Sequence, residues 1–303
     1  MYDVIIIGGG PAGLTAAAYC LRKRLEVLLI APDLGGKANY RMHLAGLEGF
    51  EHITGEEIVR KFRGQLQYLD FARIRGMAAK IEAHADESFE TFTVFTEEGN
   101  RYHTRALILA TGVMPLRLHV PDEEMLLGRG LSYSAVSHAP LFWERETAVV
   151  GSGDLALRSA AELALVASRV VLVAPEGLPD HPLKRKLTGQ QNVTILEKHH
   201  VTHIHGNGYV HAISVRSPEG SEQEIPVSGV FGELGFRPLS DLVQGLVELN
   251  AEGYVVIDDR CRTSRPGIFA AGDVTDTYAE QVLIATGEGA KAALAAYDYL
   301  LYY

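Results

Sequence analysis

The chain has 303 residues, enough for two domains that each have their own core, and its 47% hydrophobic and 22% charged residues are typical of a soluble globular protein. Its formal net charge of −10 excludes the basic surface by which proteins bind nucleic acids or anionic membranes. Its apolar runs are too short to span a membrane, and its two cysteines, Cys20 and Cys261, lie far apart in sequence. We therefore expect a cytoplasmic protein with no disulfide framework, no nucleic acid partner and no membrane partner.

The first predicted element is a short apolar strand over residues 3–7, which runs directly into a glycine-rich turn and an alanine-rich helix. This order is typical of a dinucleotide-binding site. Gly8 permits the sharp turn, Gly10 lets a pyrophosphate approach the backbone, and Gly13 permits close packing of helix on strand. Phosphates would bind the free N–H groups at the start of the helix. The predicted site comprises Gly8, Gly10, Pro11, Ala12 and Gly13.

A second parallel strand is predicted at residues 26–30, and Ala31 stands at its end. Dinucleotide folds usually place an acidic residue there, about 20 residues after the glycines, to hold the adenosine ribose. The nearest acid is Asp33, so either Asp33 holds the ribose from a shifted position or the ribose is held in another way. Gly36 and Lys37 follow in a tight turn that suits close approach of a ligand.

The rest of the chain alternates predicted strands and helices and contains a second glycine turn. The first part predicts a helix at 58–69, a hairpin formed by 89–96 and 101–102, a buried strand at 106–109 and a domain crossing near Pro115 and Pro121. A second strand, turn and helix follow at 147–166, and Ala156 replaces the last glycine of the motif. Its candidate nucleotide contacts are Gly151, Gly153, Asp154 and Ala156. The last part predicts a strand at 170–173, a meander at 193–230, a return crossing at 235–238 and a helix at 281–301.

Five of these segments together resemble the thioredoxin reductases and their low-molecular-weight flavoprotein relatives. The segments are Gly8–Gly13, Ala110–Gly112, Gly151–Ala156, Thr263–Val274 and Glu280–Ala293. The resemblance implies an α/β fold with two Rossmann-like domains, each built of three layers in the order β, β, α. An NAD(P)-binding domain at 116–242 would interrupt an FAD-binding domain at 1–115 and 243–303. The resemblance also implies a homodimer that transfers hydride through its flavin.

The matched positions imply which residues contact FAD. The pyrophosphate would lie at the glycine turn of residues 8–13, and Asp273 beside Gly272 would bind the ribityl chain. The backbone N–H groups of Gln281 and Val282 would reach the pyrimidine edge of the flavin, where a helix N-terminus stabilises the electron-rich reduced form. The implied contacts outside the first turn are Thr111, Gly112, Gly272, Asp273, Gln281 and Val282.

The first departure from the family concerns its redox dithiol, a Cys-x-x-Cys pair just before the second glycine turn. Ser134 and Ser137 stand at both cysteine positions. A hydroxyl has no accessible redox couple, so this chain cannot pass electrons from flavin to a disulfide by thiolate attack. Either the serines arose by natural divergence, which the unusual context of His138 favours, or an experimenter replaced two cysteines.

The second departure concerns the nicotinamide nucleotide. Relatives that use NADPH carry a His-Arg-Arg cluster where this chain has Glu176, which would repel a 2′-phosphate but accept from a ribose 2′-OH. This favours NADH, although Lys184–Lys186 offers another phosphate site if it is not simply a solvated helix face. Alternatively, nucleotide use is lost and the second glycine turn serves only packing. A third departure, Glu280 in place of a family arginine, also argues against ordinary NADPH chemistry.

Two further features carry weaker hypotheses. Tyr302 and Tyr303 could stack on the flavin, as C-terminal aromatics do in some relatives without the dithiol, although ordinary packing of the last helix is the simpler interpretation. Five histidines cluster in one hairpin without accompanying cysteines or an acidic pattern, so we expect a solvated strand surface and no metal site. They are His199, His200, His203, His205 and His211.

The sequence therefore predicts an FAD-dependent oxidoreductase that resembles thioredoxin reductase but lacks its dithiol, with NAD(P)H as a possible second cofactor. The expected electron acceptor is not a disulfide but a small ferredoxin- or flavodoxin-like carrier protein, a quinone or oxygen. One alternative is a disulfide oxidoreductase whose cysteines have been replaced by Ser134 and Ser137. Another is a flavin-binding sensor or interaction protein without turnover.

Overall fold

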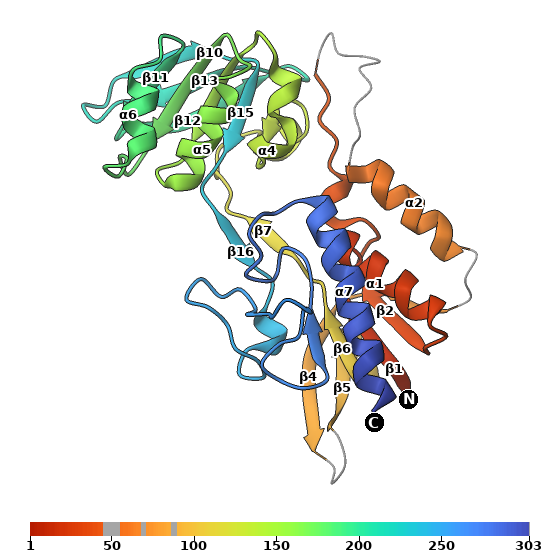
Figure 1. Cartoon of the computed structure of the whole chain (residues 1–303). Coiled ribbons are helices and arrows are strands. Elements are labelled where there is room, and N and C mark those ends of the chain that lie inside the picture. Colours follow the sequence, from red (N-terminus) through yellow and green to blue (C-terminus); the bar gives the residue numbers. More distant parts are fainter. Residues whose placement is uncertain (45–54, 68–70, 86–89, 303) are drawn as a thin grey trace. The chain divides into compact units, whose positions relative to one another are not determined.

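The computed structural model describes residues 1–44, 55–67, 71–85 and 90–302. The chain forms two compact units (Figure 1). The first unit comprises Met1–Tyr40, His52–Met114 and Arg237–Tyr303, and the second comprises Arg41–Glu51 and Pro115–Phe236. The crossing segments include β7 (Val113–Pro115) and β16 (Phe236–Pro238), which pair as a two-stranded sheet.

The first unit is built on a seven-stranded sheet whose order is β3-β2-β1-β6-β5-β4, with β17 also paired to β6. Pairs among β1, β2, β3, β6 and β17 are parallel, whereas β4 and β5 pair antiparallel. The strands are β1 (Tyr2–Ile7), β2 (Val27–Ala31), β3 (Ala72–Arg75), β4 (Ala78–Ala85), β5 (Glu90–Thr96), β6 (Arg101–Leu109) and β17 (Ile268–Ala270). The helices are α1 (Pro11–Arg22), α2 (Gly55–Gln67) and α7 (Val282–Leu301), with short 3₁₀ turns η1 (Gly36–Asn39) and η3 (Asp241–Val243).

The prediction of a separate strand at 106–109 is wrong, because β6 is one continuous strand from Arg101 to Leu109. Its first half pairs antiparallel with β5, and its second half pairs parallel with β1. The first half is partly exposed and the second half is fully buried, so the sequence changes from polar to apolar within one strand. This change in burial made one element look like two. The predicted ends at residues 69 and 89 lie outside the described residues.

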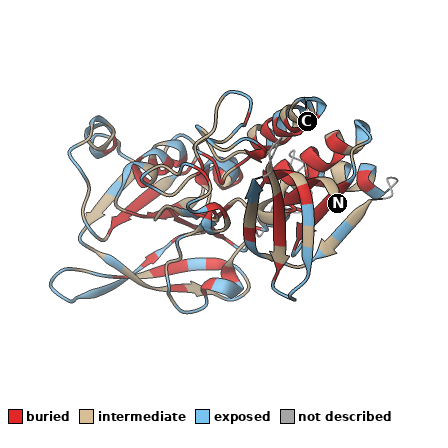
Figure 2. Ribbon diagram, turned by 90° about the horizontal axis from the view of Figure 1, so that it is seen from below, coloured by how far each residue is buried: buried red, intermediate tan, exposed pale blue. Residues whose placement is uncertain are grey.

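Strand β1 separates the two layers of apolar packing in the first unit. Val4 and Ile6 pack on the side of α1 and α7, while Ile5 and Ile7 pack with Phe92 on the other side. Successive side chains of a strand point to opposite faces, so an unbroken apolar run is what a strand covered on both faces requires. The buried residues accordingly follow the strands and the inner helix faces in Figure 2.

The second unit repeats this construction with a five-stranded parallel sheet of order β11-β10-β9-β15-β8. Its strands are β8 (Leu131–Ser132), β9 (Glu146–Val150), β10 (Arg169–Ala174), β11 (Val193–Glu197) and β15 (Gly229–Gly232). An antiparallel sheet of β12 (His200–Gly206), β13 (Val210–Arg216) and β14 (Glu222–Pro226) packs on it. The helices are α3 (Glu123–Leu126), α4 (Ala135–His138), α5 (Asp154–Leu163) and α6 (Pro182–Thr188), with the 3₁₀ turn η2 (Ala139–Phe142).

The meander expected at 193–230 is narrower than the sequence pattern indicates. β11 and β15, at its two ends, belong to the parallel sheet, and only β12, β13 and β14 form an antiparallel meander. The apolar runs of β11 and β15 look alike in either kind of sheet, so periodicity could not assign them. The α/β fold class with two Rossmann-like units is confirmed.

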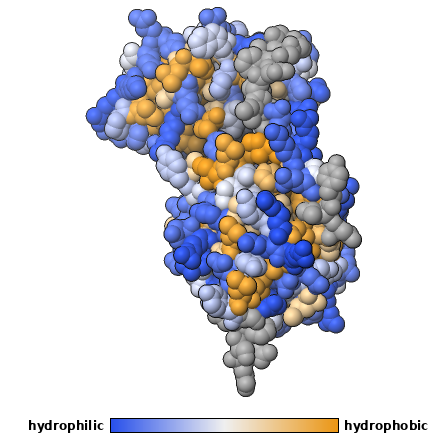
Figure 3. Space-filling view, turned by 45° about the vertical axis from the view of Figure 1, so that its right-hand side comes forward, coloured by the Kyte–Doolittle hydropathy of each residue, from blue (hydrophilic) through white to orange (hydrophobic). Residues whose placement is uncertain are grey.

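No helix within the described ranges is long and apolar enough to cross a membrane. The face shown in Figure 3 carries many hydrophilic residues, with apolar side chains in patches among them. Exposed apolar side chains on α7 include Leu283, Leu294 and Leu301.

Close packing of α7 on α1 depends on Gly289, because a Cβ there would lie 2.1 Å from the carbonyl oxygen of Ala12. We expect Gly289→Ala to lower the free energy of unfolding by about 1–3 kcal/mol, since the helices must separate to admit the methyl group. Gly287→Ala is the matched control, because no atom lies within 4 Å of its added Cβ and alanine favours the helix. Thermal unfolding of the two variants checks this, and equal stabilities would contradict it.

Candidate functional site

In the turn after β1, Gly8 and Gly13 are needed for close packing, whereas Gly10 borders open space. A Cβ on Gly8, whose φ is 117°, would lie 2.1 Å from the Ala110 oxygen, and one on Gly13 would lie 1.9 Å from the Gly8 oxygen. In contrast, a Cβ on Gly10 would meet no atom within 4 Å. Gly10 also precedes α1 as an N-cap without a side-chain hydrogen bond, so the free N–H groups of the helix face this space. The turn therefore fits a pyrophosphate.

The loop after β2 lies against this glycine turn. The N–H of Gly35 donates to the Gly9 oxygen at 2.7 Å, and a Cβ on Gly36 would lie 3.4 Å from the Gly10 Cα. The Asp33 carboxylate accepts from the N–H of Gly36 at 2.9 Å, so it stabilises its own turn. The structure thus brings Gly36 and the following Lys37 to the dinucleotide turn. Asp33 stabilises the loop that carries them, independently of any contact with a ribose.

A third segment, Gly272–Asp273, reaches the same place. Gly272 has a φ of 78°, and its added Cβ would lie 3.0 Å from the Ala12 Cβ at the start of α1. Its N–H donates to the buried carboxylate of Glu288 on α7 at 2.7 Å. Sequence analysis missed Glu288, although the signal was present, because Glu288 falls on the buried helical face marked by Ala285, Gly289 and Ala292.

The N-terminus of α7 completes the candidate FAD site. Gln281 is its N-cap, and no side-chain hydrogen bond caps this described turn, so the first N–H groups of a 20-residue helix are available to a ligand.

Thr111 and Gly112 make hydrogen bonds that fix the position of a neighbouring segment. The Thr111 hydroxyl donates to the Leu239 oxygen at 2.6 Å, and the Leu239 N–H donates to the Gly112 oxygen at 2.9 Å.

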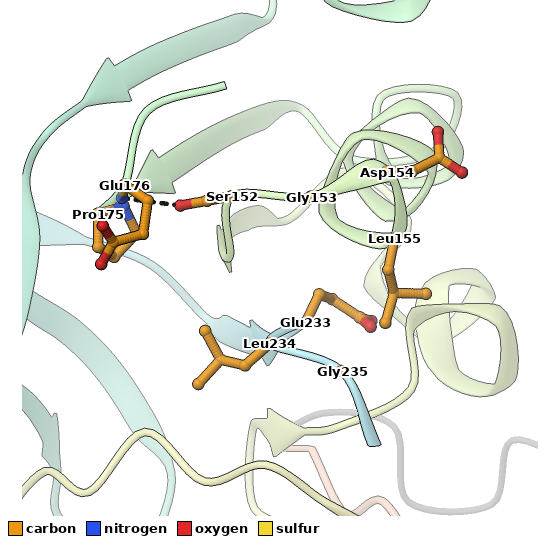
Figure 4. Close-up of a pocket in the computed structure, with 9 residues that line it drawn as sticks. All are labelled: Ser152, Gly153, Asp154, Leu155, Pro175, Glu176, Glu233, Leu234 and Gly235. Carbon is orange, nitrogen blue, oxygen red and sulfur yellow. Dashed lines mark hydrogen bonds between the residues drawn. The ribbon is translucent and has the colours of Figure 1, made fainter. Parts of the chain in front are cut away.

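The second unit contains a cavity of about 330 Å³ at its own glycine turn (Figure 4). It lies at the carboxyl ends of β9, β10 and β15, where open α/β sheets bind ligands. Gly151 is packed, with its added Cβ 2.2 Å from the Glu233 oxygen, whereas nothing lies within 4 Å of one on Gly153. The lining residues are Ser152, Gly153, Asp154, Leu155, Pro175, Glu176, Glu233, Leu234 and Gly235.

Carboxylates, not cations, are the charged side chains of this cavity. Glu176 follows β10, and its N–H donates to the Ser152 hydroxyl at 2.9 Å (Figure 4). The basic residues considered as a phosphate site have acidic partners instead, because Lys184 pairs with Glu197 at 2.8 Å and Arg185 pairs with Asp180 at 2.9 Å. The cavity therefore suits a nucleotide with a ribose diol better than one with a 2′-phosphate.

Ser134 and Ser137 lie together in a short turn. Ser134 precedes α4 and donates from its hydroxyl to that of Ser137 at 2.9 Å. Nearby, the Ser132 hydroxyl lies 2.8 Å from His138 Nδ1, and the Ala135 N–H donates to the Glu233 carboxylate at 2.9 Å. The turn thus holds two side chains in contact, in the manner that a Cys-x-x-Cys pair requires, but with hydroxyl groups.

The two cysteines offer no substitute for this pair. Cys20 and Cys261 are free and fully buried in the core of the first unit. Burial raises the pKa of each thiol to about 12, so both are protonated and unreactive near neutral pH.

The positions of the C-terminal tyrosines and of the histidine hairpin bear on the hypotheses of a flavin stack and a metal site. Tyr302 follows the last residue of α7 and is 85% exposed, about 30 Å from Gln281 by the rise of a 20-residue helix. Tyr302 therefore cannot stack, within the same chain, on a flavin bound at Gln281, and Tyr303 lies outside the described residues. The rings of His203 and His205 stack at 4.4 Å, as their shared face predicts, and the described part of the chain contains no cluster that could hold a metal.

Comparison with known proteins agrees with this architecture. Residues 2–289 match the model of the pyridine nucleotide-disulphide oxidoreductase family. The chain is 34% identical over 306 residues to a subunit of alkyl hydroperoxide reductase from Staphylococcus aureus, covering 99% of this chain and 59% of that protein. It therefore spans little more than half the length of this curated relative.

Two solved structures share the fold. The thioredoxin reductase from Streptococcus pyogenes has a TM-score of 0.90 and 34% identity, over 100% of this chain and 99% of that one. The thioredoxin reductase from Giardia duodenalis has a TM-score of 0.87 and 26% identity, over 99% of each chain. The chain belongs to the pyridine nucleotide-disulphide oxidoreductase family, as its resemblance implied.

We expect Gly10→Ala to weaken FAD binding about tenfold or more, because its methyl group would occupy the open space at the turn while leaving the apoprotein fold intact. Gly153→Ala is the matched control in the other unit, and it should leave FAD affinity unchanged. Fluorescence titration of each apoprotein with FAD measures the dissociation constants. Unchanged FAD affinity in the Gly10 variant would contradict this site.

Proposed function

We propose that the chain passes electrons from NADH through FAD to an acceptor other than a protein disulfide. Acceptors of suitable chemistry are a small ferredoxin- or flavodoxin-like carrier, a quinone or oxygen. The observation that carries this proposal is the hydroxyl pair of Ser134 and Ser137, 2.9 Å apart in the turn where the family resemblance implies two thiols.

The absence of a usable thiol limits what the flavin can reduce directly. Disulfide reduction proceeds through a thiolate that attacks a disulfide sulfur and forms a mixed disulfide. Ser134 and Ser137 cannot form this intermediate, and Cys20 and Cys261 are buried and protonated. Electrons that reach the flavin would therefore leave it directly, by transfer to a partner or small molecule.

Glu176 supports NADH as the electron donor. It lines the cavity of the second unit at the end of β10, where a carboxylate can accept from a ribose 2′-OH. At the same position a 2′-phosphate would meet a like charge. Family membership supports a nicotinamide nucleotide in general, and the charge of this cavity supports the unphosphorylated form in particular.

We also propose that two chains associate as a homodimer. Leu283, Leu294 and Leu301 lie on one face of α7 at helical spacing and are 70%, 40% and 62% exposed. Light scattering that gives the 33.0 kDa mass of a single chain would contradict this part of the proposal.

Anaerobic titration of the FAD-loaded protein with NADH and NADPH tests the donor. We expect NADH to bleach the flavin at a concentration at least about tenfold lower than NADPH, because the 2′-phosphate would lie beside Glu176. The Glu176→Gln variant should narrow this difference, and Glu222→Gln, an exposed carboxylate on β14, should leave it unchanged. Preferential bleaching by NADPH would overturn the assignment, and no bleaching by either would point to a protein donor or to a sensor without turnover.

A further inference from the structure

Lys37 lies between two carboxylates at the candidate FAD site. Its ammonium nitrogen is 2.7 Å from Glu280 Oε2 and 2.9 Å from Asp273 Oδ2. The side chains of Lys37, Glu280 and Asp273 are 36%, 23% and 16% exposed, so the cluster is largely withdrawn from water. The contact between Lys37 and Glu280 joins residues 243 positions apart in the sequence.

Lys37 and Glu280 are both anchored by backbone that already belongs to the site. Lys37 lies in η1, whose loop is hydrogen bonded to the glycine turn through Gly35 and Gly9. Glu280 directly precedes Gln281, the N-cap of α7, where a negative charge is favoured by the helix macrodipole. The pair therefore connects the start of α7 to the loop after β2, which lies against the first glycine turn.

The electrostatics favour an ionised lysine at this place. Burial alone would lower the pKa of Lys37, but the charges of Asp273 and Glu280 outweigh burial and raise it. Burial raises the pKa of Glu280, and Lys37 offsets part of that rise. A single carboxylate would hold the ammonium less firmly, because a lysine side chain is flexible and its charge is strongly hydrated.

This contact also explains the acid at position 280, where the family resemblance implies an arginine. The reversed charge is compensated within the chain by Lys37, so a cation is retained at the site but comes from a different element. Without Lys37, a carboxylate at position 280 would only repel the phosphates of FAD.

We propose that Glu280 is a positioning residue for Lys37, which it holds at the FAD site so that the ammonium can bind the anionic part of the cofactor. The proposal rests on FAD binding at the first glycine turn and is independent of which nucleotide donates electrons. The effect of Glu280 on FAD affinity is transmitted through Lys37 and should vanish when Lys37 is absent.

A double-mutant cycle on FAD affinity tests this claim. The FAD dissociation constants of apoproteins carrying Lys37→Gln, Glu280→Gln and both changes are measured by flavin fluorescence, with the absorption spectrum of bound flavin recorded for each. We expect Lys37→Gln to weaken binding at least about tenfold and Glu280→Gln about threefold to tenfold. The double variant should bind FAD as the Lys37 variant does, within about twofold, since Glu280 would have nothing left to position.

Two controls separate positioning from general damage. Lys37→Arg keeps the cation and should restore both the affinity and the flavin spectrum. The paired variant Lys80→Gln with Glu82→Gln removes an exposed ion pair of the same 2.7 Å length from β4 and should change neither. If Glu280→Gln binds FAD more tightly, or if the two single effects add, the proposal is overturned. Failure of the wild-type apoprotein to bind FAD would instead overturn the cofactor site itself.

Discussion

The first unit depends on backbone atoms that approach one another too closely to admit a side chain. At Gly8, Gly13 and Gly289, a Cβ would lie 1.9–2.1 Å from a carbonyl oxygen, a distance that no real packing allows. These contacts draw β1, α1 and α7 together, and they leave the start of α1 beside the open space at Gly10. The macrodipole of α1 then favours an anionic cofactor there.

The second unit uses the same constraint at Gly151, which packs against the backbone of Glu233. The charge of its pocket differs from the one that the family resemblance implies for NADPH users, because Glu176 follows β10 in place of a basic cluster. The two units thus share a glycine turn whose backbone would suit a dinucleotide, while the side chains at the ends of equivalent strands differ between the units. In the turn beside the second pocket, Ser134 and Ser137 place two hydroxyl groups in contact where the family resemblance implies thiols.

Features set by local sequence could be predicted, whereas features set by long-range contacts could not. The glycine turns, the strand after α1 and the final helix have strong local signals, and the structure contains all of them. The continuity of β6 and the sheet assignment of β11 and β15 depend on which strands become neighbours, which apolar runs do not reveal. The Lys37–Glu280 pair joins residues that no local pattern connects. The distance of Tyr302 from Gln281, in contrast, follows from the rise of the helix that the sequence already predicts between them.

Counting electrons tests most directly whether flavin is the only redox centre of this chain. Anaerobic reduction of the FAD-loaded protein with dithionite should consume two electrons per flavin, since neither the serines nor the two buried cysteines can take up more. The variant carrying both Ser134→Cys and Ser137→Cys provides a reference, because a disulfide at this turn would raise the count to about four. Two electrons per flavin in the unmodified chain is the result we predict, and four would contradict it.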